Sequence, residues 1–302
     1  MATLYTHQEQ NIWRTWFLMG MFFLLVIAIG WVISWYYNNP LILYVAVIFS
    51  IIMNITSYWY SDKIVIRLSG ARPVVREEQR ELWNIVENLS ITAGLPMPKL
   101  YIIDDLSPNA FATGRNKEHA VVAVTTGIMG ILNRTELEGV IAHELSHIGN
   151  RDMLVSTVAV VLAGFVSIIA DMFLHSLHFG GGRGGDRKGA GILVIVGIVL
   201  AILAPIFATL LRLALSRKRE FLADASGALL TRYPEGLASA LEKISTHAVP
   251  MRKTSHAIAH LYISDPFKKE GKKISLWTKI FMTHPPVEER LAALRGMDPV
   301  RE

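Results

Sequence analysis

The chain of 302 residues is long enough for two soluble domains, but its composition argues against a wholly soluble protein. Hydrophobic residues make up 52% of it and charged residues only 18%, whereas an average globular chain is about 25% charged. Cysteine is absent, which excludes disulfides and thiolate metal sites, so any zinc must be held by His, Asp or Glu. The net charge of +5 is not accompanied by the aromatic-basic pattern of a nucleic-acid groove, so we expect no nucleic acid and instead anionic lipid headgroups as its partners.

Two apolar stretches near the N-terminus are each long enough to cross a bilayer, which takes about 20 residues of helix. The first runs from about Trp16 to Tyr37, and the second begins after Pro40 and runs to about Tyr60. The first is longer than the apolar core of a cleavable signal peptide, about 7 to 15 residues, and it ends in bulky aromatics, so it should remain as an anchor. Residues 1–60 are therefore predicted to form a transmembrane hairpin.

A pattern typical of a soluble domain follows from residue 61 onward. Apolar residues at helical spacing predict an amphipathic helix over Glu77–Thr92, with Gly94 as its stop. Strands are predicted over Lys99–Asp104 and His119–Thr125, and Asn109–Thr113 is a short extended segment between them. This part of the chain should therefore combine helices with a small β-sheet.

Two further apolar stretches lie in the second half, from about Leu154 to Phe173 and from about Ala190 to Leu215. A flexible, glycine-rich linker joins them. Residues 154–215 are therefore predicted to form a second transmembrane hairpin, although Asp171 weakens the prediction for its first helix.

The positive charge of the short loops predicts the orientation in the membrane. Lys and Arg crowd after the second and fourth apolar stretches, whereas the link between the first two has none. Fewer positive charges, in the linker of the second hairpin, favour the opposite orientation. The two soluble parts, residues 61–153 and 216–302, are therefore expected to face the cytoplasm and to form one catalytic domain.

A metal-binding pattern, His-Glu-Leu-Ser-His, begins at His143 and ends at His147. Thr135 and Glu138 have the spacing of a capping box, so a helix is expected to start there, with Gly149 as its terminator. The two histidines are then one helical turn apart and can reach a single ion.

Glu144 lies within this pattern and can act as a general base. In such an arrangement it takes a proton from a zinc-bound water and later delivers it to the leaving amine. Zinc lowers the pKa of its bound water to about 7, so hydrolysis of an amide is the natural use. The bare pattern arises by chance in roughly one or two of every hundred such sequences, so a surface helix with two unrelated histidines is the alternative.

A catalytic zinc usually has three protein ligands, so the site needs one ligand besides the two histidines. Glu220 and Asp224 share one face of a helix-compatible run just after the fourth apolar stretch. Glu220 can bind the metal while Asp224 accepts the free N–H of a ligating histidine. The alternative is that both are solvated charges that balance Arg217 and Arg219. If residues 154–215 form a hairpin, however, this run returns to the same membrane face as the histidine helix.

These residues carry a family resemblance that extends over nearly the whole chain. The sequence resembles the membrane-bound gluzincin peptidases of the HtpX heat-shock protease family. The matching motifs are His143 to His147 with Asn150 close behind, Ser216 to Asp224, Asn109-Ala110-Phe111, and Thr283-His284-Pro285-Pro286.

The resemblance implies a mainly α fold with a small β-sheet, four transmembrane helices in two hairpins, and a cytoplasmic gluzincin-like domain. It implies an integral zinc endopeptidase of the bacterial inner membrane, with one Zn²⁺ per chain, that degrades misfolded or damaged membrane proteins in a stress response. The physiological substrates and the oligomeric state stay open.

Two secondary sites follow from the same resemblance. His284 is expected to stabilise the oxyanion of the tetrahedral intermediate, with a histidine at an exposed turn as the alternative. An edge strand is expected to bind the substrate backbone, with an ordinary hairpin strand as the alternative. The residues of this strand are Asn109, Ala110, Phe111 and Ala112.

Three other functions remain to be weighed against a quality-control protease. A non-catalytic membrane scaffold or chaperone would need the ligands but not Glu144. An intramembrane protease would embed the motif in a spanning helix, whereas polar residues such as Glu136 and Asp152 flank it here. A processing protease for prenylated proteins would need a larger transmembrane chamber than four segments provide.

Overall fold

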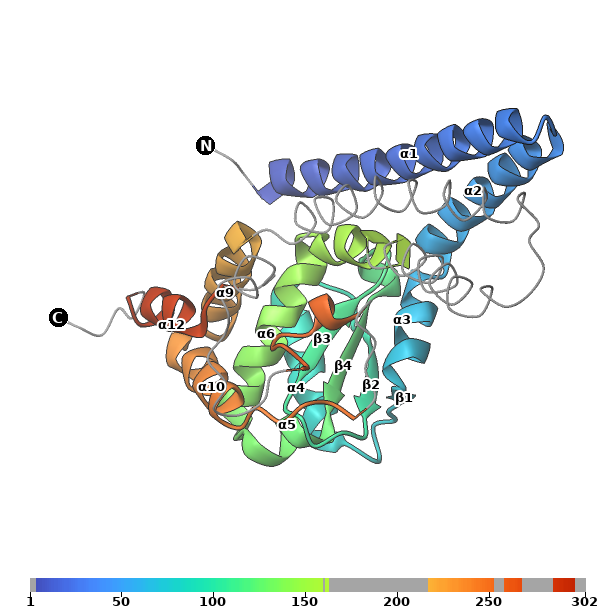
Figure 1. The fold of residues 1–302 in the computed structure, drawn as a ribbon. Helices are drawn as coiled ribbons and strands as arrows, with labels where there is room; N and C mark the ends of the chain where they lie inside the picture. The colour runs from blue at the N-terminus through green and yellow to red at the C-terminus, as the bar shows by residue number, and fades with distance from the viewer. Residues whose placement is uncertain (1–3, 160, 163–216, 253–257, 268–284, 297–302) are drawn as a thin grey trace.

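The computed structural model describes residues 4–159, 161–162, 217–252, 258–267 and 285–296 (Figure 1). A pair of long N-terminal helices extends from a domain of helices around a small sheet. The described part is therefore mainly helical with a small mixed sheet, in agreement with the predicted class.

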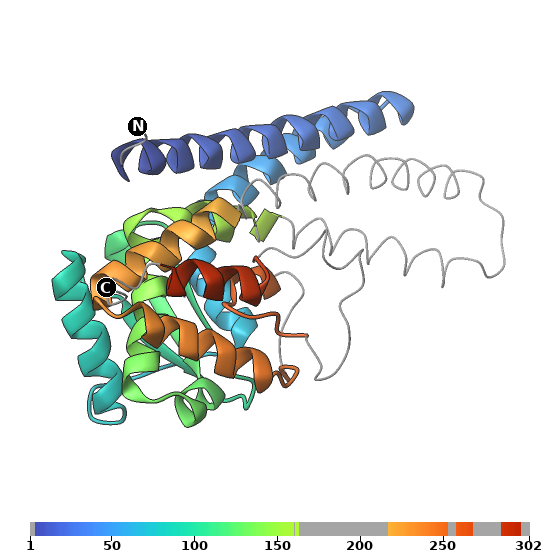
Figure 2. The ribbon, with the colours of Figure 1, turned by 90° about the vertical axis from the view of Figure 1, so that its left-hand side faces the viewer.

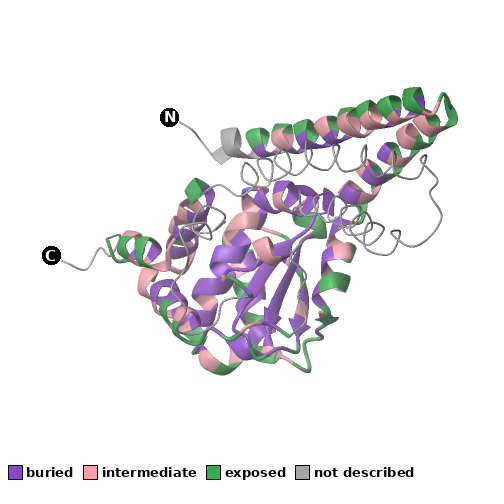
Figure 3. Ribbon diagram, in the orientation of Figure 1, coloured by how far each residue is buried: buried purple, intermediate pink, exposed green. Residues whose placement is uncertain are grey.

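The N-terminal pair consists of α1 (Leu4–Tyr36) and α2 (Leu41–Trp59), which pack against each other along their length. Both are long and apolar enough to cross a membrane, over 28 residues of α1 and 19 of α2. A side chain at Gly30 would collide with Ala46, so glycine permits this close approach of the two helices. Outward-facing parts of both helices are exposed in Figure 3, as expected for surfaces that meet lipid.

The start of the third apolar stretch is helical over residues 152–159 and 161–162. Its side chains pack against the N-terminal hairpin, where Val155 and Val158 join Leu18 and Phe22 in one apolar cluster. The remainder of the predicted second hairpin lies outside the described residues. Four membrane spans therefore stay a prediction.

The helices of the domain lie on both sides of the sheet. Their bounds are α3 (Ser61–Ser69), α4 (Arg80–Ala93), α5 (Thr126–Ile131), α6 (Arg134–Gly149), α9 (Arg217–Thr231), α10 (Pro234–Thr246) and α12 (Val287–Arg295), with short 3-10 turns η1 (Lys117–His119) and η2 (Ala259–Leu261).

The sheet has four strands in the order β1-β2-β4-β3, namely β1 (Arg72–Pro73), β2 (Lys99–Ile103), β3 (Ala110–Thr113) and β4 (Val121–Thr125). The β2–β4 pair is parallel, and the outer strands run antiparallel to their neighbours. Gly114 turns the chain from β3 toward β4 with φ +141°, where any side chain would strike the backbone of the returning segment. The predicted amphipathic helix and strands are confirmed to within a few residues.

Alternate strand residues enter two different cores, one on each face of the sheet. The face that meets α4 and α6 carries Leu100, Ile102, Ala110, Ala112, Val122 and Val124. On the opposite face Phe111 packs edge-to-face on Tyr262, with ring centroids 5.1 Å apart, beneath α3 and the segment around η2. Strands β3 and β4 are therefore buried on both faces, as Figure 3 shows, whereas the edge strand β1 is exposed.

Helix α6 crosses one face of the sheet and is itself covered by α9 and α10, with α12 beside these two (Figure 2). Glu136 near its start is buried and accepts hydrogen bonds from Lys243 and Ser239 of α10. Burial raises the pKa of Glu136, but these hydrogen bonds, one from the Asn133 backbone and the charge of Lys243 outweigh burial and hold the pKa below its ordinary value.

The capping box of α6 lies two residues before the predicted one, so that prediction was wrong. Asn133 accepts a hydrogen bond from the Glu136 N–H, and Glu136 accepts one from the Asn133 N–H. Asn133 takes this role because its backbone is extended, whereas Thr135 already lies within the helix and donates its hydroxyl hydrogen to Asn133. Glu138 pairs instead with Arg134 on the helix surface.

Candidate metal centre

The candidate metal centre lies where α6 and α9 come closest together. His143, Glu144 and His147 are on α6, and Glu220 is on the first turn of α9. Gly227 permits the close packing, because a Cβ at this position would lie only 3.0 Å from the backbone nitrogen of His143. Residues far apart in the sequence thus meet on two adjacent helix faces.

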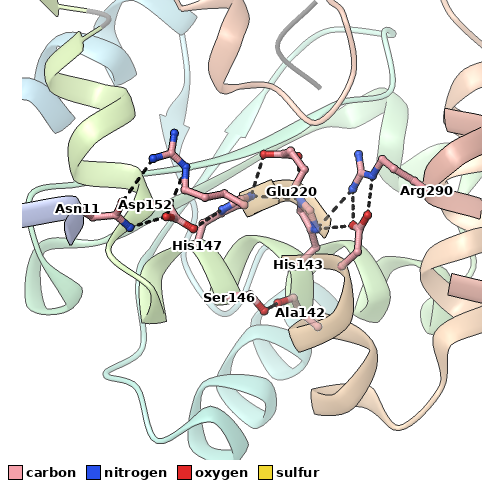
Figure 4. A network of polar contacts seen from close by, with 10 residues as sticks. Asn11, Ala142, His143, Ser146, His147, Asp152, Glu220 and Arg290 are labelled. Atoms are coloured by element: carbon pink, nitrogen blue, oxygen red, sulfur yellow. Dashed lines mark hydrogen bonds and ion pairs between the residues drawn. The ribbon is translucent and has the colours of Figure 1, made fainter. Parts of the chain in front are cut away.

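The two histidines and Glu220 point toward a common position (Figure 4). The Nε2 atoms of His143 and His147 are 3.2 Å apart. The Glu220 carboxylate lies 3.7 Å from His143 Nε2 and 3.6 Å from His147 Nε2. Among the described residues this is the one group of His, Asp and Glu side chains spaced to hold a metal ion.

This donor set fits a zinc ion by geometry and by chemistry. Two nitrogen ligands about 2.05 Å from one zinc ion at the tetrahedral angle are about 3.3 Å apart. The observed separation of the two Nε2 atoms, 3.2 Å, agrees with that value. Two imidazoles and one carboxylate are also a ligand set of catalytic zinc sites, which keep a fourth position open.

His143 is oriented by a carboxylate on α9. Its Nδ1 donates to Asp224 Oδ1 at 2.9 Å, and both side chains are almost fully buried. Arg290 of α12 binds the same carboxylate with two nitrogens, at 2.6 and 2.8 Å. Burial raises the pKa of Asp224, but the charge and hydrogen bonds of Arg290 and the contact with His143 lower it to about 2, so this carboxylate is ionised at neutral pH.

His147 is oriented by a different carboxylate. Its Nδ1 faces Asp152 Oδ2 at 3.3 Å, just beyond the end of α6. Burial lowers the pKa of His147, but the hydrogen bond to Asp152 and the charges of Glu220, Asp152 and Glu144 outweigh burial and raise the pKa to about 9. A metal ion that binds Nε2 must displace the proton that this raised pKa keeps on the His147 ring, so metal binding at neutral pH should release a proton.

Glu144 lies between the two histidines on α6 and is 3% exposed. Glu220 and Asp224, for which solvated charges were the alternative, are both buried. The structure therefore places the three carboxylates within the protein beside the histidines, rather than on the solvent surface.

The predicted substrate strand is β3, at the edge of the sheet. Its register with β4 directs the backbone N–H and C=O of Ala110 and Ala112 away from the sheet. Ala110 already accepts a hydrogen bond from the Ile263 N–H at 2.9 Å, and the Asn109 side chain exchanges two hydrogen bonds with the Ser264 backbone. The chain itself therefore covers the first half of this edge, and Ala112 is the next outward-facing position.

His284 lies outside the described residues, so its role stays a prediction. Sequence reasoning missed Arg290, Asp152 and Asn11 as parts of the site. A carboxylate just after the histidine helix is a signal that could have identified Asp152. Arg290 and Asn11 have no such signal, because they reach the site from α12 and α1 only once the chain is folded.

The site combines a helix that carries two histidines and an intervening glutamate with a carboxylate from a second helix. The domain that holds it is attached to a pair of apolar helices. These features define the class of membrane-anchored metalloproteases. Residues 76–298 match the family model described as Peptidase family M48. The chain therefore belongs to peptidase family M48.

Relatives and one solved structure are similar along nearly the whole chain. The protein described as "Protease HtpX homolog" from Thermoanaerobacter pseudethanolicus is 45% identical over 300 residues, which cover 98% of each chain. One with the same description from Dictyoglomus turgidum is 47% identical over 296 residues, 98% of this chain and 95% of the relative. The crystal structure of S. mikatae Ste24p has a similar fold, with a TM-score of 0.51, 18% sequence identity, and 96% of this chain and 67% of that chain covered.

Proposed function

We propose that this membrane-anchored protease is a zinc-dependent endopeptidase that hydrolyses misfolded or damaged membrane proteins, with its active site on the cytoplasmic face of the bacterial inner membrane. One observation supports the metal assignment most strongly. The Nε2 atoms of His143 and His147 are 3.2 Å apart and face the Glu220 carboxylate, the spacing expected of ligands to one tetrahedral ion.

In the proposed mechanism His143, His147 and Glu220 would hold the ion, and Asp224 and Asp152 keep the two imidazoles in the tautomer that offers Nε2. When bound, zinc would lower the pKa of a water molecule at the site. Glu144, on the same helix between the histidines, takes up the proton of the attacking water. It then delivers the proton to the amine that leaves the cleaved peptide bond.

The substrate strand is proposed to add to β3 beyond the part of its edge that Ile263 and Ser264 cover. Ala112 offers the outward-facing N–H and C=O beyond the part of the edge occupied by Ile263 and Ser264. Backbone pairing of this kind accepts many sequences, because it depends on main-chain groups. Broad recognition of unfolded segments is what disposal of damaged membrane proteins requires.

The assignment of the ligands can be tested with the full chain purified in detergent. Zinc content and casein cleavage should both be lost in His147→Asn and Glu220→Gln. His247→Asn is the matched control, because this histidine is exposed and lies at the end of α10. Normal zinc content in Glu220→Gln would remove Glu220 from the ligand set, and cleavage that survives complete removal of metal would overturn the proposed function.

A further inference from the structure

The Asn11 side chain links the membrane-anchor helix α1 to the metal centre. This residue precedes Asp152 by 141 positions, yet the two side chains are in direct contact. Asn11 is 3% exposed, although it belongs to a helix whose outer surface is apolar and open. Burial of an amide is costly unless its polar atoms are bonded, so its partners indicate why it is there.

The amide of Asn11 is fully engaged at the end of α6 (Figure 4). Its Nδ2 donates to Asp152 Oδ1 at 2.6 Å and to the Asn150 backbone oxygen at 3.1 Å. Its Oδ1 accepts from Arg219 Nη1 at 3.4 Å. A flipped amide would direct its oxygen at two acceptors and its NH₂ at a cation, so the network admits one orientation.

Asp152 transmits this contact to the metal ligand. One carboxylate oxygen accepts a hydrogen bond from Asn11 at 2.6 Å and lies 3.7 Å from Arg219 Nε, and the other faces His147 Nδ1 at 3.3 Å. The chain turns between Asn150 and Asp152 through Arg151, whose φ of +57° is unusual for a residue with a side chain. Asp152 thus begins the next helix directly after this turn, and the Asn11 amide bonds both its carboxylate and the turn backbone at Asn150.

The two histidines are supported from opposite ends of the chain. Arg290, near the C-terminus, fixes Asp224 behind His143 through two short hydrogen bonds. Asn11, near the N-terminus, occupies the corresponding position for His147, with Asp152 between them. Figure 4 shows Asn11 and Arg290 approaching the pair of histidines from opposite sides.

We propose that Asn11 is a positioning residue for His147, so that docking of the anchor helix α1 sets the metal affinity of the site. This inference rests on the proposed metal site. It implies that a chain whose α1 is not docked holds zinc weakly, so that metal loading follows placement of the anchor. Residues that orient a ligating histidine typically change metal affinity by 10- to 100-fold when they are replaced.

The test measures zinc affinity of the full chain in detergent, by competition with a chromophoric chelator. All proteins carry Glu144→Gln, which prevents self-cleavage. Asn11→Leu removes the amide, and Asn11→Asp keeps its size but places a carboxylate oxygen against Asp152. Thr15→Val is the matched control, because Thr15 is buried one turn further along α1 and, among the described residues, its hydroxyl bonds the Asn11 backbone oxygen.

Both Asn11 variants should bind zinc about 10-fold or more weakly, whereas Thr15→Val should remain within about 2-fold of the parent. The visible absorption of bound Co²⁺ should change in the Asn11 variants and not in the control, because the ligand geometry at His147 changes. Because Asn11→Asp preserves the packing volume, poor packing of α1 in Asn11→Leu cannot alone account for a loss that both variants share.

Parental affinity in both Asn11 variants would overturn this inference, as would an equal loss in Thr15→Val, which would assign the effect to packing of α1 in general. The parent protein separates this outcome from failure of the proposed function. If the Glu144→Gln parent itself binds no zinc, the metal site is wrong; if the parent binds zinc and the Asn11 variants bind equally well, only the role of Asn11 is wrong.

Discussion

The distance between α6 and α9 at Gly227 should decide how well the site binds metal. A Cβ on Gly227 would lie 3.0 Å from His143 N and 3.2 Å from both His143 Cα and Ala142 C, all of them backbone atoms. Gly227→Ala therefore requires α9 to move away from α6 by a few tenths of an ångström. Because α9 carries Glu220, this movement displaces a metal ligand. Zinc sites tolerate deviations of only about 0.2 Å in their ligand distances.

We expect Gly227→Ala to weaken zinc binding by about tenfold, the lower end of the range for a displaced ligand support, and Gly227→Val to weaken it further. Alanine favours a helix over glycine by about 1 kcal/mol. This gain opposes the cost of moving α9 away from α6, so the free energy of unfolding of the metal-free alanine variant should change little. The substitution therefore separates ligand spacing from folding.

The assay is chelator competition for zinc with the full chain in detergent, combined with thermal unfolding of the metal-free protein. Gly130→Ala is the control, because nothing lies within 4 Å of a Cβ at that position in α5. Its zinc affinity should equal that of the parent. Unchanged affinity in both Gly227 variants would refute the argument that close packing of α6 and α9 sets the ligand spacing.

Two further substitutions test the supports of α6. Asp224→Asn should weaken zinc binding by about 10- to 100-fold, which chelator competition measures. It should also destabilise the fold by about 3 to 5 kcal/mol, because it leaves Arg290 charged and buried without its partner, and thermal unfolding measures this effect. Glu136→Gln should cost about 1 to 2 kcal/mol at neutral pH by removing the ion pair with Lys243. Because the folded-state pKa of Glu136 lies below its ordinary value of 4.5, its contribution is fully present above that pH and is lost as the pH falls through the lowered pKa. The difference in unfolding temperature between parent and variant should accordingly shrink on acidification, and a difference that stays constant would contradict this assignment.

The parts of the site that sequence predicts are those fixed by local spacing. Two histidines four residues apart must share a helix face, so their convergence follows once α6 is a helix. Glu220 could be inferred as their neighbour because the apolar stretches were expected to return the chain to the same side of the membrane. The structure brings Glu220 to both histidines, with carboxylate distances of 3.6 and 3.7 Å.

The supports of the site could not be predicted in the same way. Arg290 lies 66 positions after Asp224 in the sequence, and Asn11 lies 141 positions before Asp152. These pairs depend on how α12 and α1 pack on the domain, which no local pattern encodes. Even the start of α6 was misplaced, because both Asn133 and Thr135 are good N-cap residues and only the backbone conformation decides between them.

Glu144→Gln tests the central claim most directly, with Glu138→Gln as the control on the same helix. Glu138 is partly exposed and, within the described part of the chain, pairs with Arg134 on the helix surface, so its replacement should leave both zinc content and casein cleavage unchanged. The Glu144 variant should retain one zinc per chain, because the three ligands are intact, and should lose cleavage almost completely, because the proton acceptor is gone. Casein cleavage at the parental rate by a Glu144→Gln protein that holds its zinc would contradict the account.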